Sequence, residues 1–454
     1  MTEPSLPRLA DLAGMVLDRV RAATSGRAEA EVMVDATTVS FTRFANSFIH
    51  QNVTDHATTL RLRLHLDGRT ATGSTTKVTD EALAALAERT VGASRLLPVD
   101  PGWAGLAPPA ALASGGNIDH ATAAAAPTQR ARIVADFVEA TKGLEAAGFC
   151  QSTHSLAAFA NSAGQAIEGG YTDATLDGIA RTGSADGSAR RSAVRLADLD
   201  GAALGEKAAH KARTGSNPVE IAPGEFEVVL EPSAVTDLMT WLAYGGFNGK
   251  AVAEGRSFVR IGEQQFDPVI TMIDDVGSGA GIGVPFDVEG TPKHPTVLVS
   301  GGVCQTIVHD RRTARKVGAE STGHAIPGGE SIGAFPLNLG LEPGAAGSTI
   351  EELIGGVGRG LLVTEFNYTN VLDPRSVVVT GLTRNGLWLI EDGQVTDAVQ
   401  NLRFTQSYPA ALAPGAVLGV SAARETVPIF FEGVAFSAPA LRLAGWHFTG
   451  GAAG

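Results

Sequence analysis

Four leucines alternate with polar side chains in "TTLRLRLHLDGRTATGSTT", residues 58–76. Successive side chains of a β-strand point to opposite faces of a sheet, so the leucines from Leu60 to Leu66 share one face. The arginines and the histidine between them share the other face. Asp67-Gly68 then supplies a two-residue turn of the kind that joins antiparallel strands. The stretch therefore predicts a hairpin in a sheet with one buried face and one polar face.

Helices are predicted on both sides of this hairpin. Residues 7–23 carry apolar side chains at helical spacing. Thr79 stands where it can cap a second helix, whose first turn holds two acidic residues. Residues 1–96 are therefore expected to form an N-terminal α-β domain in the order helix, three strands, helix.

The next two segments differ in composition. Residues 97–128 are dense in proline, alanine and glycine and are expected to form a connection. Residues 129–222 are expected to form a middle α/β segment, with helices at about 129–146 and 200–213 and strand-like pieces between them. The sequence shows no fixed-period repeat.

Short β-rich runs dominate residues 223–454, among them "FEVVL", "TVLVSGGVCQTIVH", "SVVVTGL" and "VPIFFEGVAF". Glycine, proline and aspartate turns separate these runs, which is typical of an antiparallel barrel or sandwich. The fold class predicted for the whole chain is α+β, with an N-terminal α/β domain and a β-rich C-terminal domain.

Charge and composition exclude several classes of protein. The net charge of −13 argues against a nucleic-acid partner and against an anionic membrane surface, since both need a basic surface. No apolar run reaches the roughly 20 residues that span a bilayer, and "MTEPSLPRLADLAGM" lacks the pattern of a signal peptide. We therefore expect a cytoplasmic protein.

Cys150 and Cys304 are the two cysteines of the chain and are expected to be free, buried thiols.

The ten histidines show no spacing typical of metal ligands. No two of them stand four or five residues apart, so the helical H-E-x-x-H motif is absent. His294, His309 and His324 could still converge in the folded chain, although scattered histidines are mostly structural. Spacing alone therefore predicts no metal site.

The run "GGESIG" places Ser331 in the G-x-S-x-G pattern of a serine-hydrolase nucleophile. Such a nucleophile needs a strand before it and a helix after it, whereas "GHAIPG" precedes Ser331 and "AFPLN" follows it. A glycine-rich loop is the favoured interpretation, and a hydrolase that uses Ser331 is the alternative.

Four long motifs follow one another along the chain. They are "NSFIHQNVTDHATTLRLRLHLDGRTATGSTT", "VPFDVEGTPKHPTVLVSGGVCQTIVHDRRTARKVGAESTGHA", "LEPGAAGSTIEELIGGVGRGLLVTEF" and "DPRSVVVTGLTRNGLWLIEDGQV". In this order they resemble the TldD/PmbA family, the modulator of DNA gyrase proteins. The resemblance covers most of residues 20–445, and it is specific because several linked motifs stand in the family's order.

The TldD-type subunit of that family resembles a zinc peptidase, with H-E-x-x-x-H on a helix and a cysteine near the C-terminus. This sequence departs from the pattern at both places. Residues 233–255, "SAVTDLMTWLAYGGFNGKAVAEG", contain no histidine, and "GVSAARETVPIFFEGVAFSAPALRL" contains no cysteine. Zinc activation of water is therefore not supported in this chain, and we expect no catalytic or metal-binding residue in it.

This departure implies a PmbA-like, or TldE-like, subunit. The resemblance then implies a soluble TldD/TldE-type metallopeptidase complex that acts on extended or unfolded peptides. In that complex this chain is non-catalytic, and zinc is bound only by a TldD-like partner. A homodimer is expected where the partner is absent, with the interface in both assemblies on the C-terminal β-rich domain. The alternative is a stand-alone hydrolase that uses Ser331 or an unrecognised metal cluster.

The stretch "RRTARKVGAESTGHA", residues 311–325, holds most of the candidate contact residues. The candidates for a cavity wall or a partner contact are Glu289, Arg315, Lys316 and His324. Arg315 is expected to pair with Glu289, because a guanidinium can hold a carboxylate through two parallel N–H groups. His324 is expected near them on the cavity wall. The alternative is that Arg315 and Lys316 form a solvated helical face and that glycines define the motif.

Overall fold

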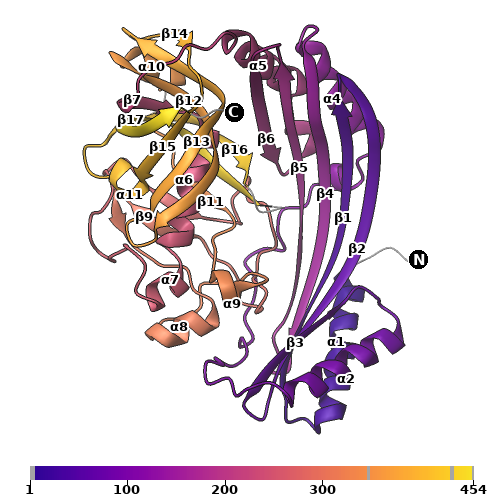
Figure 1. Ribbon diagram of the computed structural model, residues 1–454. Coiled ribbons are helices and arrows are strands. Elements are labelled where there is room, and N and C mark those ends of the chain that lie inside the picture. The colour runs from indigo at the N-terminus through magenta and orange to yellow at the C-terminus, as the bar shows by residue number, and fades with distance from the viewer. Residues whose placement is uncertain (1–5, 345–347, 430–433, 452–454) are drawn as a thin grey trace.

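The computed structural model describes residues 6–344, 348–429 and 434–451 (Figure 1). Two sheets organise these residues, one N-terminal and one C-terminal, and the predicted α+β fold class is confirmed. Part of the predicted run "VPIFFEGVAF", residues 430–433, lies outside the described residues, as do residues 1–5 at the start of the chain. Among the described helices, none is long and apolar enough to cross a bilayer.

The N-terminal sheet has six strands within the described residues, in the order β3-β2-β1-β4-β5-β6, and all neighbours are antiparallel. In chain order the elements of this domain are α1 (Leu6–Thr24), β1 (Glu29–Ala45), β2 (Phe48–Leu66), β3 (Arg69–Thr75), α2 (Asp80–Ser94), α3 (His120–Ala123), α4 (Pro127–Ala140), β4 (Glu145–Asn161), β5 (Ala166–Arg181), β6 (Asp186–Ala193), the 3₁₀ turn Leu196–Asp198 and α5 (Gly201–Thr214). The segments predicted as 1–96 and 129–222 therefore contribute to one sheet, because β1 pairs with β4 across the connection.

The two halves of this domain share one topology. Residues 6–94 run helix, three strands, helix, and residues 127–214 contain the same succession. The strand order is symmetric about the antiparallel pair β1–β4, as an approximate two-fold axis between the halves would produce. This repeat is one of topology, and the sequence holds no fixed period that would reveal it.

The two faces of the N-terminal sheet have different environments. The predicted buried leucines, from Leu60 to Leu66, are at most 3% exposed and pack with α1 and α2. Helices α4 and α5 pack over the other end of the same face. The opposite face, which we call the open face, looks toward the C-terminal domain (Figure 1). The predicted division into a buried face and a polar face is confirmed.

The C-terminal domain is built on a mixed sheet of eleven strands within the described residues. In chain order its elements are β7 (Gly224–Leu230), α6 (Pro232–Gly245), α7 (Gly249–Ala253), β8 (Met272–Asp274), β9 (Thr296–Ser300), β10 (Val303–Cys304), α8 (Arg311–Val317), α9 (Gly329–Ile332), β11 (Leu339–Leu341), α10 (Ile350–Gly355), β12 (Arg359–Asp373), β13 (Val378–Glu391), β14 (Gln394–Ala398), β15 (Leu402–Ser407), α11 (Tyr408–Ala411), β16 (Val417–Pro428) and β17 (Ala435–Gly451). Strands β17, β15, β13, β12 and β7 close into a ring, because β7 also pairs with β17. The ring is a barrel with one parallel pair, β7–β12, which the sequence did not indicate.

Helix α6 packs against this ring and carries much of the domain core. Val235, Leu238, Met239 and Leu242 are at most 1% exposed and belong to the main apolar cluster of the domain. A helix that is apolar on nearly all sides is expected inside a domain. Pro232 stands in its first turn, where the fixed φ of proline suits a helix start.

The helix predicted at about 129–146 ends earlier than its apolar pattern suggested, because α4 stops at Ala140. Lys142 and Gly143 have positive φ angles of 52° and 86°, which turn the chain out of the helix. β4 then begins at Glu145. Apolar periodicity alone did not distinguish the last helical turn from the start of the strand.

The buried leucine face gives a direct test of the fold. Leu62→Ala removes a side chain that is 1% exposed, and we expect it to lower the free energy of unfolding by about 2 to 5 kcal/mol. Val53→Ala on the same strand is the control, since Val53 is 42% exposed and should cost less than about 1 kcal/mol. Urea unfolding followed by circular dichroism measures both values. Equal losses would contradict the assignment of the two faces.

Candidate functional site

A cavity of about 1060 Å³ lies between the open face of the N-terminal sheet and the C-terminal domain. One wall comes from β1, β2, β4, β5 and β6, and the other comes from α6, β12 and the β16–β17 region. Its volume lies at the upper end of the roughly 300 to 1,000 Å³ that ligand cavities occupy. The gap between the two domains is therefore the candidate functional site.

The sheet wall is polar because alternate residues of its strands face the cavity. On β5, Tyr171, Asp173, Thr175 and Asp177 all line it. Thr153 of β4 lies directly opposite Asp173 in the antiparallel register. Sequence reasoning missed this wall, although the polar alternation along β5 is the signal that could have found it.

Carboxylates outnumber guanidinium groups around the cavity. The charged residues that line it are Asp55, Asp173, Asp177, Asp237, Glu365, Arg43, Arg61 and Arg190. Arg190 of β6 lies 3.0 Å from Glu365 of β12 and 3.6 Å from Asp177, so it ties the sheet to the C-terminal domain. Arg61 pairs with Asp35 on the neighbouring strand. Five carboxylates against three guanidinium groups leave the lining of the cavity acidic.

Asp173 has no ion-pair partner among the described residues. It is 4% exposed, the Thr153 hydroxyl donates to its carboxylate, and its Oδ1 has no hydrogen-bond partner in the described part of the chain. Burial raises the pKa of Asp173 to about 6. A buried carboxylate without a cation destabilises a folded protein, and one retained on a cavity wall is typical of a functional site.

Helix α6 presents one polar stripe to the cavity. Ser233, Thr236, Asp237 and Thr240 recur at intervals of three and four residues and all line it. The remaining faces of the helix are apolar and buried in the domain core. The helix that carries the core therefore also supplies the second wall of the cavity.

Asp237 is the charged member of this stripe. Its Oδ1 accepts a hydrogen bond from the Thr369 hydroxyl at 2.8 Å, and its Oδ2 accepts one from the Tyr408 hydroxyl at 2.7 Å. Burial raises the pKa of Asp237 to about 6, and these donors limit the rise. The carboxyl group is thus fixed in position, with a pKa raised toward the neutral range.

The α6 stripe does not fit a zinc site. It offers three hydroxyls and one carboxylate that two donors already hold, whereas zinc is bound by histidine, cysteine and carboxylate ligands. No group of three or more His, Cys, Asp or Glu side chains within the described ranges could hold a metal ion. His294, His309 and His324 therefore do not converge on a shared ion.

Glu289 lies at the junction of the two domains and does not line the cavity. It is 5% exposed, and its Oε1 lies 2.8 Å from Nη2 of Arg63 on β2. Its Oε2 accepts a hydrogen bond from the backbone N–H of Arg311 at 2.8 Å. Arg63 Nε also lies 2.5 Å from Glu31 Oε1. Burial raises the pKa of Glu31 to about 7, while Arg63 lowers it and Glu289 raises it further.

The predicted pair between Arg315 and Glu289 is wrong. Arg315 donates to the backbone oxygen of Trp103 instead, while Glu289 binds Arg63 and the first residue of α8. Arg315 stands four residues into that helix, about 6 Å along its axis from the N–H group that meets Glu289. Because α8 begins at Arg311, the backbone N–H of Arg311 faces the Glu289 carboxylate and the Arg315 side chain does not.

The arginines of α8 hold the connection between the two halves of the N-terminal domain. Arg312 forms hydrogen bonds of 2.9 and 2.7 Å with the two carboxylate oxygens of Asp100. Arg311 Nε donates to the backbone oxygen of Gly105 at 3.1 Å. The "RRTAR" motif therefore fastens residues 100–105 against the C-terminal domain.

His324 is buried in the C-terminal domain, so its predicted place on the cavity wall is wrong. Its Nε2 lies 3.2 Å from Asp274 Oδ1, and its Nδ1 lies 2.9 Å from the Thr322 hydroxyl. Asp274 Oδ2 also accepts from the backbone N–H of Asn338 at 2.7 Å. These bonds make His324 part of a polar core pair. Lys316 is exposed on α8, as the solvated-face alternative expects.

Ser331 lacks the surroundings of a hydrolase nucleophile. It lies in the single turn α9 with its side chain exposed, and the residues before that turn, 321–328, are irregular. A nucleophile elbow needs a strand at that place. The structure agrees with the glycine-rich loop interpretation.

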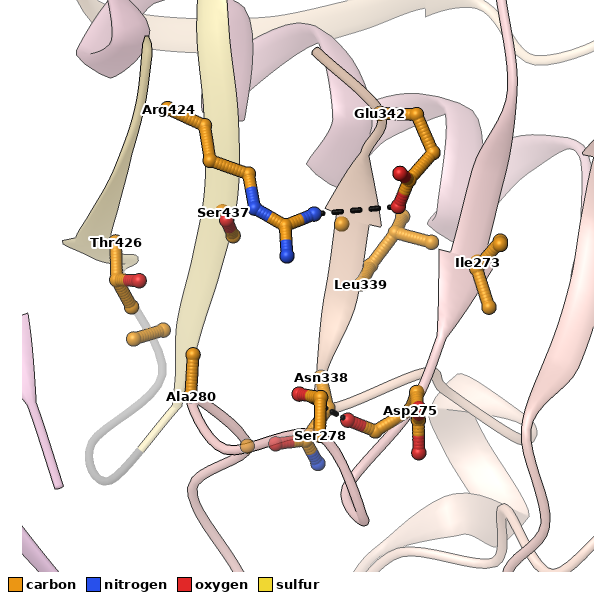
Figure 2. A pocket seen from close by; sticks show the side chains of 13 residues that line it. Ile273, Asp275, Ser278, Ala280, Asn338, Leu339, Glu342, Arg424, Thr426 and Ser437 are labelled. Carbon is orange, nitrogen blue, oxygen red and sulfur yellow. Dashed lines mark hydrogen bonds and ion pairs between the residues drawn. The ribbon is translucent and has the colours of Figure 1, made fainter.

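A smaller cavity of about 130 Å³ lies on the C-terminal sheet (Figure 2). Arg424 and Glu342 face each other across it, with Nη1 and Oε1 3.2 Å apart, and Asn338 and Ser437 also line it. One water occupies about 30 Å³ in the liquid, so this space suits a few waters and not a peptide. The larger cavity remains the candidate site.

Comparison with known proteins identifies the class to which this two-domain fold belongs. Residues 223–450, just over half of the chain, match the family described as PmbA/TldA metallopeptidase C-terminal domain. The chain belongs to the PmbA/TldD family. The match begins where the sequence analysis starts the β-rich C-terminal domain.

Two solved structures have the same fold over nearly the whole chain. TldE from Thermococcus kodakarensis superposes with a TM-score of 0.86 at 20% identity, covering 96% of this chain and 100% of that one. A putative modulator of a DNA gyrase from Thermotoga maritima superposes with a TM-score of 0.81 at 20% identity, covering 96% and 100%. At this identity the likeness establishes the fold alone.

Relatives in sequence match over shorter stretches. A metalloprotease of Methanothermobacter thermautotrophicus is 26% identical over 271 residues, 55% of this chain and 56% of the relative. A metalloprotease TldD homologue of Haemophilus influenzae is 28% identical over 203 residues, 44% of this chain and 39% of the relative. An uncharacterised protein of Methanocaldococcus jannaschii is 36% identical over 108 residues, 23% and 26%. The chain thus spans between about a quarter and a little over half of these relatives' lengths.

Asp173→Asn is expected to stabilise the protein at pH 7.5. The pKa is near 6 in the folded chain against 3.8 in the unfolded chain, so ionisation lowers stability as pH rises through this window. The loss of unfolding free energy caused by this ionisation reaches its full value, at most about 3 kcal/mol, above about pH 6. It vanishes below about pH 4, where the carboxyl group is protonated in both states. The midpoint of thermal unfolding should rise at pH 7.5 and match the wild type below pH 4. Asp18→Asn is the control, because Asp18 is exposed on α1. A lowered midpoint for Asp173→Asn would contradict the prediction.

The domain junction predicts unequal effects for two arginines. Arg63→Ala leaves two buried carboxylates, Glu31 and Glu289, without their cation and should cost about 3 to 5 kcal/mol of unfolding free energy. Arg315→Ala removes an exposed side chain bound to a backbone oxygen and should cost about 1 kcal/mol or less. Urea unfolding at pH 7.5 measures both. A larger loss of unfolding free energy for Arg315→Ala than for Arg63→Ala would contradict the importance of the ion pairs that Arg63 forms with Glu31 and Glu289.

Proposed function

We propose that this chain is the non-catalytic, TldE- or PmbA-like subunit of a TldD/TldE-type metallopeptidase complex that acts on extended or unfolded peptides. The observation that carries the proposal is the cavity-facing side of α6. The family resemblance places the metal-binding helix of the catalytic subunit at this point, and here the helix presents Ser233, Thr236, Asp237 and Thr240. This wall of the cavity thus lacks the histidine and cysteine ligands that zinc chemistry requires.

The cavity suits a peptide in an extended conformation. It runs between a sheet wall and a helix wall, and both walls offer hydroxyl and carboxyl groups at short intervals. Such groups can accept and donate the main-chain hydrogen bonds of an extended peptide without demanding a particular sequence. The acidic balance of the lining should favour peptides that carry basic residues.

The proposed complex assigns zinc and catalysis to a TldD-like partner subunit. This chain would contribute part of the peptide-binding surface, and it would form a homodimer when the partner is absent. We place the complex in the cytoplasm, since the sequence shows neither a bilayer-spanning run nor a signal-peptide pattern. Because the chain is acidic, we expect neither nucleic acid nor a membrane among its partners.

The alternative, a stand-alone hydrolase, has less support. Ser331 stands on an exposed single turn without a preceding strand, and His324 is engaged by Asp274 inside the domain core. A serine nucleophile requires a base within hydrogen-bond reach, which His324 in that position does not supply. An unrecognised metal cluster has no candidate ligand group within the described residues.

The proposal is tested by expressing this chain alone and together with a TldD-like chain. Alone, the chain should contain far less than one zinc per molecule by elemental analysis and should not cleave an unfolded casein substrate. The two chains together should elute as one complex that contains zinc and cleaves casein. Stoichiometric zinc and cleavage by this chain alone would overturn the proposal, and so would a failure of the two chains to associate.

Two variants locate its role within that complex. Val39→Trp adds bulk on the open face at a residue that lines the cavity and should lower kcat/KM of the complex at least about tenfold. Ser331→Ala is the control and should stay within about threefold of the wild type, whereas loss of a nucleophile costs several orders of magnitude. The reverse ranking would favour the hydrolase alternative.

A further inference from the structure

Tyr368 of β12 presents an aromatic ring to the large cavity. The residue is 78% exposed, and its side chain forms no hydrogen bond and no ring contact within the described residues. Aromatic side chains usually bury most of their surface, and ligand cavities are commonly lined by them. The ring of Tyr368 is therefore available to a molecule that enters the cavity.

A regular strand would not place Tyr368 in this position. Successive side chains of a strand alternate between its two faces, so Tyr368 would share a face with Phe366. Phe366 is 8% exposed and stacks on Trp446 in the core of the barrel, with 4.9 Å between the ring centroids. The exposure of Tyr368 therefore requires a break in the alternation of β12.

A β-bulge supplies this break. In the pairing of β12 with β13, residues 368–369 together oppose the single residue Gly381. Tyr368 has a φ of 50°, which a bulky side chain rarely adopts. Such backbone strain persists only where the surrounding structure imposes it, and it clusters at sites that bind ligands. Bulges of this kind re-aim a side chain next to a functional site.

Thr369 holds the bulge in place. Its hydroxyl donates to Asp237 Oδ1 at 2.8 Å and accepts from Trp241 Nε1 at 2.9 Å. Both partners belong to α6, so the bulge is fixed to the helix beside it. Gly381 leaves room for the Thr369 methyl group, since a Cβ at that glycine would lie 2.7 Å from it. Thr369 therefore takes the position toward α6, and its neighbour Tyr368 is turned into the cavity.

The surroundings of the ring favour a cationic group as its ligand. Tyr368 directly precedes the residue that contacts Asp237, so the ring and the Asp237 carboxylate border the same part of the cavity. Two hydroxyls hold this carboxylate, which leaves two of its roughly four lone-pair sites free for a further donor. A guanidinium or ammonium group is attracted both to the face of an aromatic ring and to a carboxylate.

We propose that Tyr368 is a specificity-determining residue whose ring stacks on an arginine or lysine side chain of a bound peptide, while Asp237 accepts a hydrogen bond from the same side chain. Thr369 is then a positioning residue, because it acts through the placement of that ring. The inference rests on the proposed function, since it requires a peptide in the cavity. It goes further by naming the residue that selects one side chain of that peptide.

Fluorescence anisotropy with two labelled probes tests the inference on the full-length chain alone. Both probes are decapeptides of valine and serine, one with a central arginine and one with citrulline, which keeps the shape of arginine and lacks its charge. The wild type should bind the arginine probe with a Kd at least about tenfold lower than that of the citrulline probe. Tyr368→Leu should reduce this ratio to about threefold or less. Tyr368→Phe retains a ring and should keep the ratio within about twofold of the wild type.

A matched control removes a ring elsewhere. Phe48→Leu changes an aromatic residue that is 58% exposed and does not line the cavity, so the ratio of the two Kd values should stay within about twofold of the wild type. Circular dichroism verifies that each variant folds.

Thr369 gives a second test that does not alter the ring. Thr369→Val removes the hydroxyl that joins the bulge to Asp237 and Trp241, whereas Thr369→Ser keeps a hydroxyl. The valine variant should lower the arginine-to-citrulline preference at least about threefold, and the serine variant should restore it to within about twofold of the wild type. A general loss of folding would weaken both probes alike, so the preference reports the placement of the ring.

The outcomes separate this inference from the proposed function. Equal binding of the two probes by the wild type, or a preference that Tyr368→Leu leaves unchanged, would overturn the inference and leave the proposed function standing. If neither probe binds with a Kd below about 1 mM, the peptide-binding role in the proposed function fails as well. Tighter binding of a norleucine probe than of the arginine probe, lost in Tyr368→Leu, would assign the ring to apolar side chains and overturn the choice of a cation.

Discussion

The Arg63 guanidinium binds one carboxylate from each domain, Glu31 and Glu289, and the arrangement of the two domains depends on it. Removing the cation from a buried carboxylate is strongly destabilising, so Glu289 of the C-terminal domain depends on Arg63 of the N-terminal sheet. Arg190 makes a second bridge, to Glu365, at the cavity itself. Between these two ion-pair groups the sheet and the barrel are held at a spacing that leaves a cavity instead of a packed interface.

The two walls of this cavity follow from two different periodicities. Alternation along β5 brings Tyr171, Asp173, Thr175 and Asp177 to one side, and the three-to-four spacing of α6 brings its polar stripe to the other. The same helix buries its apolar side chains in the barrel core. The fold therefore supplies the enclosure, and the few side chains on that stripe set the chemistry of one of its walls.

Asp173 and Asp237 show how this chain differs from a protein optimised for stability alone. Both carboxyl groups are buried enough that their pKa rises to about 6, and Asp173 has no compensating cation among the described residues. An asparagine at position 173 would keep the shape and remove the charge. Buried titratable groups that are retained on a cavity wall at a cost in stability are typical of a functional site.

Local patterns in the sequence determined much of this protein. The alternating leucines set the buried face of β2, helical spacing predicted α1, and linked motifs indicated the family, because burial along one element needs only the period of that element. Only the tertiary structure decided that β1 pairs with β4, that Glu289 meets Arg63 across 226 positions and that His324 is a core residue. These contacts join residues far apart in the chain, and they depend on the register of strands and the start of helices, which composition and spacing leave open.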